Sequence, residues 1–285
     1  MTLEQHLRDR RAAGRKLLMP YVTGGITPDW TDQLRAYADA GADLIEVGLP
    51  FSDPTVDGAT IQRASDVALA RGATPDGLLD ELSRVDVGVP LVLSTYSNLA
   101  LRTAEFCRSA AAAGTAGLIV PDLPVEEAAG LAAAAAAAGL DLALLASPAT
   151  PSPRLRTVAT ASRGFVYAVS LMGTTGERMA LAGSAAALAT RLREVTDRPV
   201  LLGFGISTPA HAAEAARYAD GVVVGAALMR QVLDGADAAR VGAFVGTLRS
   251  ALDTEHGGGN GSDGAIPRDR RGPGGEDPRG RVRAG

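Results

Sequence analysis

The sequence predicts a single (β/α)₈ barrel of the TIM type. Short apolar runs suited to β-strands alternate with alanine-rich stretches of helical periodicity. Eight such units fill about 250 residues, which is the usual size of this fold. No Gly-x-Gly-x-x-Gly turn opens the first unit, so an open doubly wound sheet is the weaker alternative.

The eight expected strands are short runs dominated by Val, Ile, Leu and Ala. They are Leu17–Val22, Asp43–Val47, Pro90–Ser94, Gly117–Val120, Asp141–Leu145, Gly164–Val169, Val200–Gly203 and Gly221–Val224. Helices are expected between them because Asp, Ser or Thr starts and Gly stops frame the intervening stretches. Examples are Pro28–Ala40, Thr103–Ala113, Val125–Ala138 and Pro209–Tyr218, and a further helix is expected before the first strand.

The C-terminal segment 256–285 differs in composition from the rest of the chain. It is built from Gly, Pro, Arg and Asp with few large apolar residues, so it cannot bury enough surface to offset the entropy of ordering. We therefore expect a barrel domain over 1–255 and a disordered tail over 256–285. Contact of the tail arginines with an acidic partner is the alternative.

Composition narrows the class of protein. The chain of 285 residues is 46% hydrophobic with a net charge of -4, which gives no basis for binding nucleic acid or an anionic membrane. The single cysteine, Cys107, excludes an internal disulfide and is expected in the core. Met1–Lys16 has no apolar signal core, and no uninterrupted apolar run is long enough to span a membrane. We expect a cytoplasmic protein.

A carboxylate lies inside the second expected strand. Glu46 interrupts an apolar run, and Asp57 follows eleven residues later in a loop with two prolines. A buried acid is costly unless it is paired or kept for chemistry, and the spacing lets both acids reach one cavity. The alternative is that Glu46 is half-buried with its hydrogen bonds satisfied by the protein, and that Asp57 lies in an ordinary turn.

A barrel would gather the informative residues at one face. Nine of them lie at the ends of expected strands or in the loops that follow, at the face where barrel enzymes hold their active sites. They are Glu46, Asp57, Tyr96, Asp122, Ser147, Tyr167, Thr175, Gly205 and Gly225.

Two glycine loops suggest a phosphate site. Gly203–Ser207 and Gly225–Ala227 follow the seventh and eighth strands, and the second begins a short helix, Ala226–Leu233. Backbone N–H groups and a helix N-terminus there favour an anion, although glycine also closes plain turns. Gly176 lies in the long loop Ser170–Gly183, which we expect to be a mobile lid.

The rare residue types restrict the chemistry. The only lysine, Lys16, precedes the first strand, so a Schiff base at the opposite face is excluded. His6, His211 and His256 lie in helices or the tail, so no metal site is expected. A lyase built here must rely on general acid–base catalysis, which requires a leaving carbon that accepts a proton, such as C3 of an indole.

The stretch from Glu46 to Gln62 reads Glu-x-Gly-x-Pro-Phe-Ser-Asp-Pro-x-x-Asp-Gly-x-x-Ile-Gln and resembles the signature of the tryptophan synthase α-subunit family. Further matching motifs follow in order over roughly residues 15–250. They are Tyr96-Ser97-Asn98, Pro121–Glu127, Gly173–Gly176, Gly203–Ser207 and Gly225-Ala226.

The resemblance implies retro-aldol cleavage of indole-3-glycerol phosphate to indole and glyceraldehyde 3-phosphate. By this resemblance Glu46 moves the protons and Asp57 accepts the hydrogen bond of the indole N–H. Tyr167 would form a hydrogen bond near the glycerol. The alternative for Tyr167 is that it is an aromatic residue of the strand with a purely structural role. Substrate contacts are implied for Tyr21, Ile61, Tyr96, Ile119, Thr175 and Val223, and phosphate contacts for Gly176, Phe204, Gly205, Gly225 and Ala226.

The resemblance also implies a partner. Asp53 and Pro54 match partner-facing positions, so a β-subunit in an αββα tetramer is expected, with pyridoxal phosphate in that subunit and no cofactor in this chain. Four positions depart from the family pattern: Ile26 replaces an acid, Ala226 replaces a serine, and Thr55-Val56 replaces Leu-Ala. The alternatives are a free-standing lyase that releases indole, an inactive barrel with an allosteric role, and a phosphate-sugar isomerase.

Overall fold

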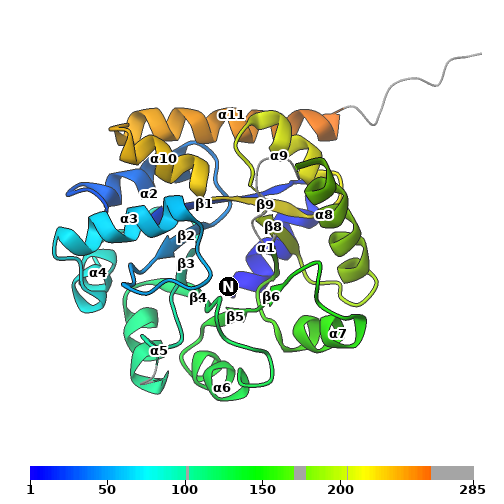
Figure 1. Ribbon diagram of the computed structural model, residues 1–285, viewed down its shortest axis with the longest axis horizontal. Helices are drawn as coiled ribbons and strands as arrows, with labels where there is room; N and C mark the ends of the chain where they lie inside the picture. Colours follow the sequence, from blue (N-terminus) through cyan, green and yellow to red (C-terminus); the bar gives the residue numbers. More distant parts are fainter. Residues whose placement is uncertain (101–102, 170–177, 204, 258–285) are drawn as a thin grey trace, which may run out of the picture.

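The computed structural model describes residues 1–100, 103–169, 178–203 and 205–257. Parallel strands form a barrel with helices around it (Figure 1). The strands are β1 (Leu17–Thr23), β2 (Ile45–Gly48), β3 (Leu91–Ser94), β4 (Thr115–Ile119), β5 (Asp141–Ala143), β6 (Leu145–Ala146), β7 (Val166–Val169), β8 (Val200–Gly203) and β9 (Gly221–Val224). The predicted barrel is confirmed.

The fifth predicted strand is divided. The strand order is β5-β4-β3-β2-β1-β9-β8-β7-β6, so the two ends of the sheet are β5 and β6, which replace the single predicted strand Asp141–Leu145. β5 pairs with β4, and β6 pairs with β7. Between them the Leu144 N–H donates to the Ser162 hydroxyl at 3.3 Å, and the Leu144 carbonyl accepts from Tyr167 N–H at 3.1 Å. The hydrogen bond to the Ser162 side chain replaces a backbone bond and separates β5 from β6. The barrel is closed at this point by the continuous chain from β5 through Leu144 to β6.

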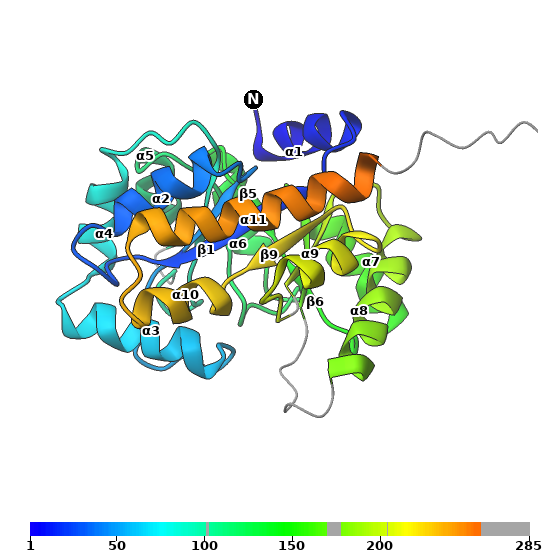
Figure 2. The ribbon, with the colours of Figure 1, turned by 90° about the horizontal axis from the view of Figure 1, so that it is seen from above.

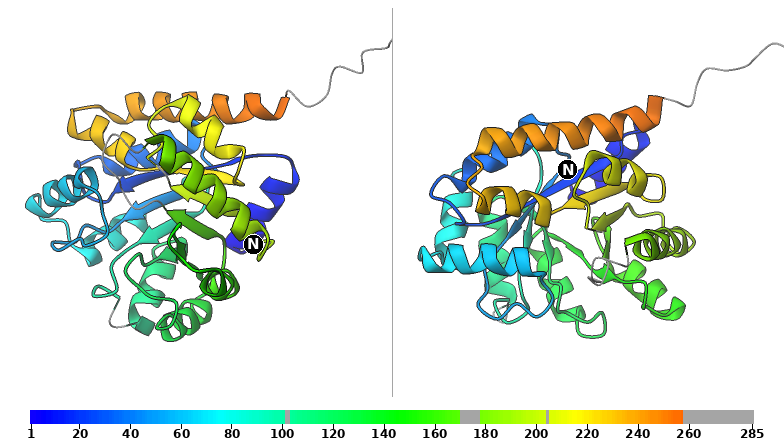
Figure 3. Two further views of the ribbon diagram at one scale, coloured as in Figure 1. Left: turned by 45° about the vertical axis from the view of Figure 1, so that its right-hand side comes forward. Right: turned by 45° about the horizontal axis from the view of Figure 1, so that its top comes forward.

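The helices follow the expected alternation. They are α1 (Leu3–Ala12), α2 (Trp30–Asp39), α3 (Ala59–Ala70), α4 (Pro75–Leu82), α5 (Thr103–Ala112), α6 (Ala129–Ala137), α7 (Ser152–Ala161), α8 (Arg178–Arg193), α9 (Pro209–Ala216), α10 (Ala226–Leu233) and α11 (Ala238–Gly257). The start of α6 was predicted four residues too early, because Glu127 and Ala128 make i→i−3 turn bonds to Pro124 and Val125 instead of helical ones. The last helix, α11, packs on α2 and α9 (Figure 3).

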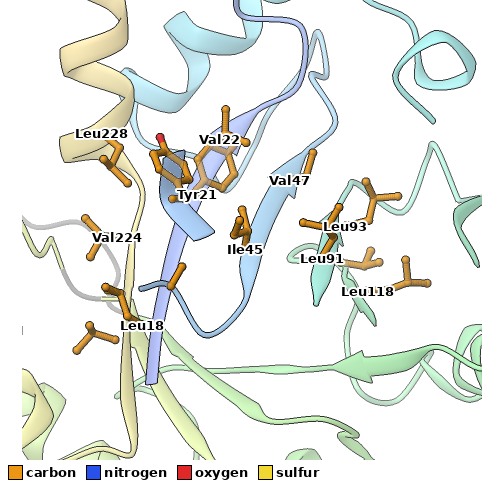
Figure 4. Packing of buried hydrophobic residues seen from close by; sticks show 14 of the residues in the cluster. Leu18, Tyr21, Val22, Ile45, Val47, Leu91, Leu93, Leu118, Val224 and Leu228 are labelled. Carbon is orange, nitrogen blue, oxygen red and sulfur yellow. The ribbon is translucent and has the colours of Figure 1, made fainter. Parts of the chain in front are cut away.

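Two apolar layers lie on opposite sides of the strands. The outer layer fills the space between sheet and helices, and Figure 4 shows Leu18, Ile45 and Leu93 of this layer on adjacent strands. The inner layer lies inside the barrel and includes Leu17, Met19, Leu44, Val92 and Phe165. Because strand side chains alternate between faces, the sequence of each strand sets what enters the barrel.

The first helix closes the amino-terminal end of the barrel. Figure 1 shows α1 near the centre of the ring of strands, and the view in Figure 2 places it to one side of them. Leu3 of α1 is 2% exposed. A β-carbon on Gly117 would lie 2.8 Å from its Cδ2 atom, and a β-carbon on Gly164 would lie 3.1 Å from the same atom. Glycine at both positions makes room for this plug, so the functional cavity lies at the opposite end.

Candidate active site

A cavity of about 300 Å³ lies at the carboxyl ends of the strands. Ten residues predicted from sequence line it: Tyr21, Glu46, Asp57, Ile61, Tyr96, Tyr167, Gly205, Val223, Gly225 and Ala226. They come from loops and strands on all sides of the barrel, up to 205 residues apart in the sequence (226 − 21). The barrel therefore brings the acids and the glycine loops to one place.

Strand alternation explains why these side chains point inward. On β1, Leu17 and Met19 belong to the inner layer, and Tyr21 is the next residue on that face. Glu46 of β2 lies two residues after Leu44 of the inner layer, which immediately precedes the strand, and it is the register partner of Tyr21. The polar side chains that line the cavity thus come next, on the same face, after the apolar residues of the inner layer.

Glu46 is a buried carboxyl group. It is 4% exposed, and its Oε2 atom has no hydrogen-bond partner among the described residues. Burial raises its pKa to about 8; a hydrogen bond from Ser94 opposes this shift, and the charge of Asp57 adds to it. The side chain is therefore a neutral acid over much of the physiological pH range, with one oxygen free for a ligand.

Asp57 is held by a tyrosine from the next βα loop. The Tyr96 hydroxyl donates to Asp57 Oδ2 at 2.9 Å. Burial raises the pKa of Asp57, and the bond from Tyr96 lowers it. The two acids thus differ in environment. Glu46 is buried inside the barrel, whereas Asp57 is half-buried on a loop and accepts a hydrogen bond from the Tyr96 hydroxyl.

Two tyrosines enter the cavity above strand glycines. A β-carbon on Gly48 would lie 2.1 Å from the Tyr21 hydroxyl oxygen, and one on Gly203 would lie 2.6 Å from the Tyr167 ring. Burial, reinforced by nearby carboxylates, raises the pKa of both tyrosines above the ordinary value. Both hydroxyls therefore stay protonated and can donate a hydrogen bond.

The glycine loops form another part of the lining. Gly205 has φ +45°, a backbone conformation that favours glycine, and it follows β8. Gly225 is the N-cap of α10, so the positive end of that helix lies at the cavity. This arrangement suits an anionic group at this side.

Six other predicted positions do not line the cavity or lie outside the described residues. Ile119 is fully buried in the inner layer and does not line the cavity. Asp53 is exposed on the loop, away from the lining, and Pro54 is half-buried beside it. Thr175, Gly176 and Phe204, with most of the expected lid, lie outside the described residues, as do residues 258–285 of the expected tail. α11 itself runs to Gly257.

Sequence reasoning did not assign roles to Ser94 and Gly48. Ser94 hydrogen-bonds Glu46, and Gly48 leaves space for Tyr21. A hydroxyl residue at the end of an otherwise apolar strand was the available signal for Ser94. The space requirement at Gly48 depends on a side chain 27 residues away (48 − 21), so no local pattern reveals it.

The residues that other chemistries would need lie elsewhere. Lys16 Nζ donates to the Ala219 carbonyl at 2.9 Å, just before β9 begins, and His6 Nε2 lies 3.0 Å from the Asp43 carbonyl, before β2. Within the described ranges, no three His, Cys, Asp or Glu side chains are grouped to hold a metal ion. No helix in those ranges is both long and apolar enough to cross a membrane.

Comparisons with known proteins agree with this site. The family model described as tryptophan synthase alpha chain matches residues 7–248. The chain is 44% identical over 257 residues to the tryptophan synthase alpha chain of Chloroflexus aggregans, covering 86% of this chain and 96% of that one. It is 48% identical over 227 residues to that of Chloroflexus aurantiacus, covering 77% and 85%.

Solved structures give the same result. A crystal structure of tryptophan synthase from M. tuberculosis matches with a TM-score of 0.80 and 37% identity, covering 88% of this chain and 97% of that one. The tryptophan synthase subunit alpha from Legionella pneumophila matches with a TM-score of 0.81 and 33% identity, covering 89% and 99%. This chain belongs to the tryptophan synthase alpha chain family, the lyases that cleave indole-3-glycerol phosphate in tryptophan biosynthesis.

Proposed function

We propose that Glu46 and Asp57 divide the work of a retro-aldol cleavage of indole-3-glycerol phosphate. The observation that supports this most directly is the shared cavity, in which two acids of different environment lie with two glycine loops. One acid can move protons while the other balances a developing positive charge. The family supplies the reaction, and the assignment of roles to these residues is our proposal.

Glu46 begins as the neutral acid because its pKa is raised to about 8. It gives its proton to indole C3, and the ring becomes an indolenine cation. The resulting carboxylate then takes the proton of the glycerol hydroxyl as the bond from C3 to the glycerol carbon breaks. The bonding electrons return to the ring, which releases indole and an aldehyde, and Glu46 is again protonated.

Asp57 accepts the indole N–H and stabilises the cation. Tyr21 and Tyr167 keep their protons, and we propose that Tyr167 donates to the glycerol portion. Tyr21, Ile61, Tyr96 and Val223 contribute the substrate slot, with Thr175 and Ile119 proposed from the family pattern. The phosphate lies against Gly205, Gly225 and Ala226, together with Gly176 and Phe204.

Family membership implies a β-subunit partner. We propose an αββα tetramer in which only the β-subunit carries pyridoxal phosphate and receives indole. The exposed Asp53 and its neighbour Pro54 are the proposed contacts. Ile26, where the family often has an acid, is 3% exposed and packs in the outer layer, so its side chain serves the core.

Indole release by the purified chain, with and without a tryptophan synthase β-subunit, tests this proposal. Glu46→Gln should lower the rate roughly 10²–10⁴-fold, the usual contribution of general acid–base catalysis. Glu194→Gln, an exposed change just after α8, is the matched control and should keep wild-type activity. Retention of more than a few per cent of activity by Glu46→Gln would reject the role of Glu46.

The partner is tested in the same assay. Addition of the β-subunit should raise indole release by roughly tenfold or more, a typical coupling. Asp53→Ala should reduce that gain and leave the basal rate unchanged. High basal activity with no response to the β-subunit would establish a free-standing lyase instead.

A further inference from the structure

The Tyr96 hydroxyl makes three hydrogen bonds with one short segment. It donates to Asp57 Oδ2 at 2.9 Å, and it accepts from the backbone N–H groups of Val56 and Asp57, each at 3.2 Å. A phenol offers one proton and acts as an acceptor through its oxygen, so these bonds occupy the group. Its hydroxyl is therefore committed to the loop, and only the ring remains for a ligand.

The same ring holds the other end of that loop. Phe51 stacks on Tyr96 with ring centroids 5.0 Å apart and an interplanar angle of 25°. Residues 51–57, here called the Asp57 loop, are thus fixed at both ends by one side chain. Val56 within this loop is 46% exposed, and besides Tyr96 the side chain of Gln62 holds that end through hydrogen bonds to the carbonyls of Asp57 at 2.8 Å and Pro54 at 3.4 Å.

Tyr96 is itself well anchored. It is 5% exposed and lies two residues after the end of β3. The next residue, Ser97, donates to the carboxylate of Asp122 from its N–H at 2.8 Å and from its hydroxyl at 2.6 Å. Asp122 follows β4, so two neighbouring strands support the tyrosine.

We propose that Tyr96 is a positioning residue, whose hydroxyl fixes the backbone and the carboxylate of Asp57 in the orientation that receives the indole N–H. The bond uses Oδ2, and among the described residues Tyr96 makes no hydrogen bond to Oδ1, which we propose receives the ligand. This inference rests on the proposed role of Asp57. The positioning itself is a property of the loop and can be measured without catalysis.

The hydrogen bond from the Tyr96 hydroxyl also affects the pKa of Asp57. Removing the Tyr96 hydroxyl removes the contribution that lowers the pKa of Asp57 and leaves burial, which raises it. Other titratable groups coupled to Asp57 are Tyr21 on β1, Glu46 on β2 and Tyr167 on β7. Loss of the hydroxyl therefore predicts a second, pH-dependent effect that a purely structural role for Tyr96 would not produce.

Tyr96→Phe tests the proposal because it removes only the hydroxyl and keeps the ring that stacks on Phe51. Tyr37→Phe is the matched control, since the Tyr37 hydroxyl is buried in α2 without a hydrogen-bond partner among the described residues. Hydrogen exchange of the Val56 and Asp57 amides is measured in both variants. Exchange should accelerate about tenfold or more in Tyr96→Phe, the order expected for loss of an acceptor, and should be unchanged in Tyr37→Phe.

Kinetics form the second arm. In Tyr96→Phe, kcat for indole release should fall roughly ten- to a hundredfold with a smaller change in KM, the range expected for loss of a hydrogen bond to a charged group. The acid limb of the pH profile attributable to Asp57 should move to higher pH. Phe51→Leu, which keeps the hydroxyl, should leave the two amides protected.

The outcomes distinguish the positioning role of Tyr96 from the proposed function of the chain. Unchanged amide exchange in Tyr96→Phe overturns the positioning role whether or not the chain is active. Faster exchange with wild-type kcat and an unmoved acid limb also overturns it, because the loop would then be free without consequence. A wild-type chain that releases no indole rejects the proposed function, while the exchange data still decide whether Tyr96 holds the loop.

Discussion

The hydroxyl of Tyr21 occupies the space that a side chain on Gly48 would need. An ideal β-carbon on Gly48 would lie 2.1 Å from the hydroxyl oxygen and 2.6 Å from the ring carbon that bears it. Gly48 lies two residues after Glu46 on the same strand, and the Tyr21 hydroxyl lies 3.1 Å from that of Thr23. The glycine of the Glu-x-Gly sequence therefore shapes the cavity beside the proposed catalytic acid.

Gly48→Ala should lower activity, because the added methyl group displaces Tyr21. Overpacking of this kind costs about 1–3 kcal/mol of unfolding free energy. The matched control is Gly130→Ala in α6, where a β-carbon meets nothing within 4 Å and alanine favours the helix. Urea denaturation and indole release would show the contrast; equal behaviour of the two variants would refute it.

Glu46 should make the stability of the wild type depend on pH. Its pKa is raised from 4.5 to about 8 in the folded chain, so between these values the folded state holds a proton that the unfolded state loses. Wild-type stability should fall relative to Glu46→Gln as pH rises from about 4.5 through about 8. Chemical denaturation of both at several pH values measures the difference, and parallel curves would contradict the raised pKa.

Gly225→Asp should weaken binding of glyceraldehyde 3-phosphate at least tenfold, because a carboxylate at the N-cap of α10 would repel the phosphate and occupy its place. Gly225→Ala is the control, since its β-carbon would meet Tyr21 at 3.5 Å, an ordinary contact. Titration calorimetry with indole should show little change in either variant. Equal losses for indole and the phosphorylated ligand would mean that the loop only closes a turn.

Leu3→Ala should destabilise the barrel by about 2–5 kcal/mol, the cost of a cavity left by a buried leucine. Leu3 is 2% exposed, whereas Met1 nearby is 94% exposed, so Met1→Ala should change nothing measurable. Urea denaturation compares the two. A loss below about 0.5 kcal/mol in Leu3→Ala would show that the amino-terminal end does not depend on this side chain.

The sequence was sufficient for the fold because its main signals are local. Apolar runs and helix punctuation located every strand, since each depends on residues close together in the chain. The division at Leu144 was not predictable, because it depends on a hydroxyl 18 residues away, at Ser162. The start of α6 was misplaced because alanine-rich sequence favours helix throughout, while a turn at Pro124 delays it.

The candidate site could be predicted where residue type alone carries chemistry. Acids in apolar surroundings and glycine loops after strands pointed to Glu46, Asp57, Gly205 and Gly225, and the cavity contains all four. Ile119 was also assigned to the substrate slot; it is buried in the inner layer as the register partner of Ser94, which lines the cavity, so its contact with a substrate stays a prediction. The hydrogen bonds of Tyr96 join residues 39 and 40 positions apart, a relation that exists only after the barrel closes.

The plug formed by α1 has a consequence for the order of folding during synthesis. The first helix leaves the ribosome first, yet two of its partners come late: Glu4 N–H donates to Asp141, and Arg8 donates to Asp197, 189 residues away. Before those residues emerge, α1 can contact only early parts of the chain such as Asp43, and the long-range contacts form slowly. Complete docking of the amino terminus can therefore occur only after most of the barrel has been translated, and full protection of α1 from proteolysis would report a completed barrel.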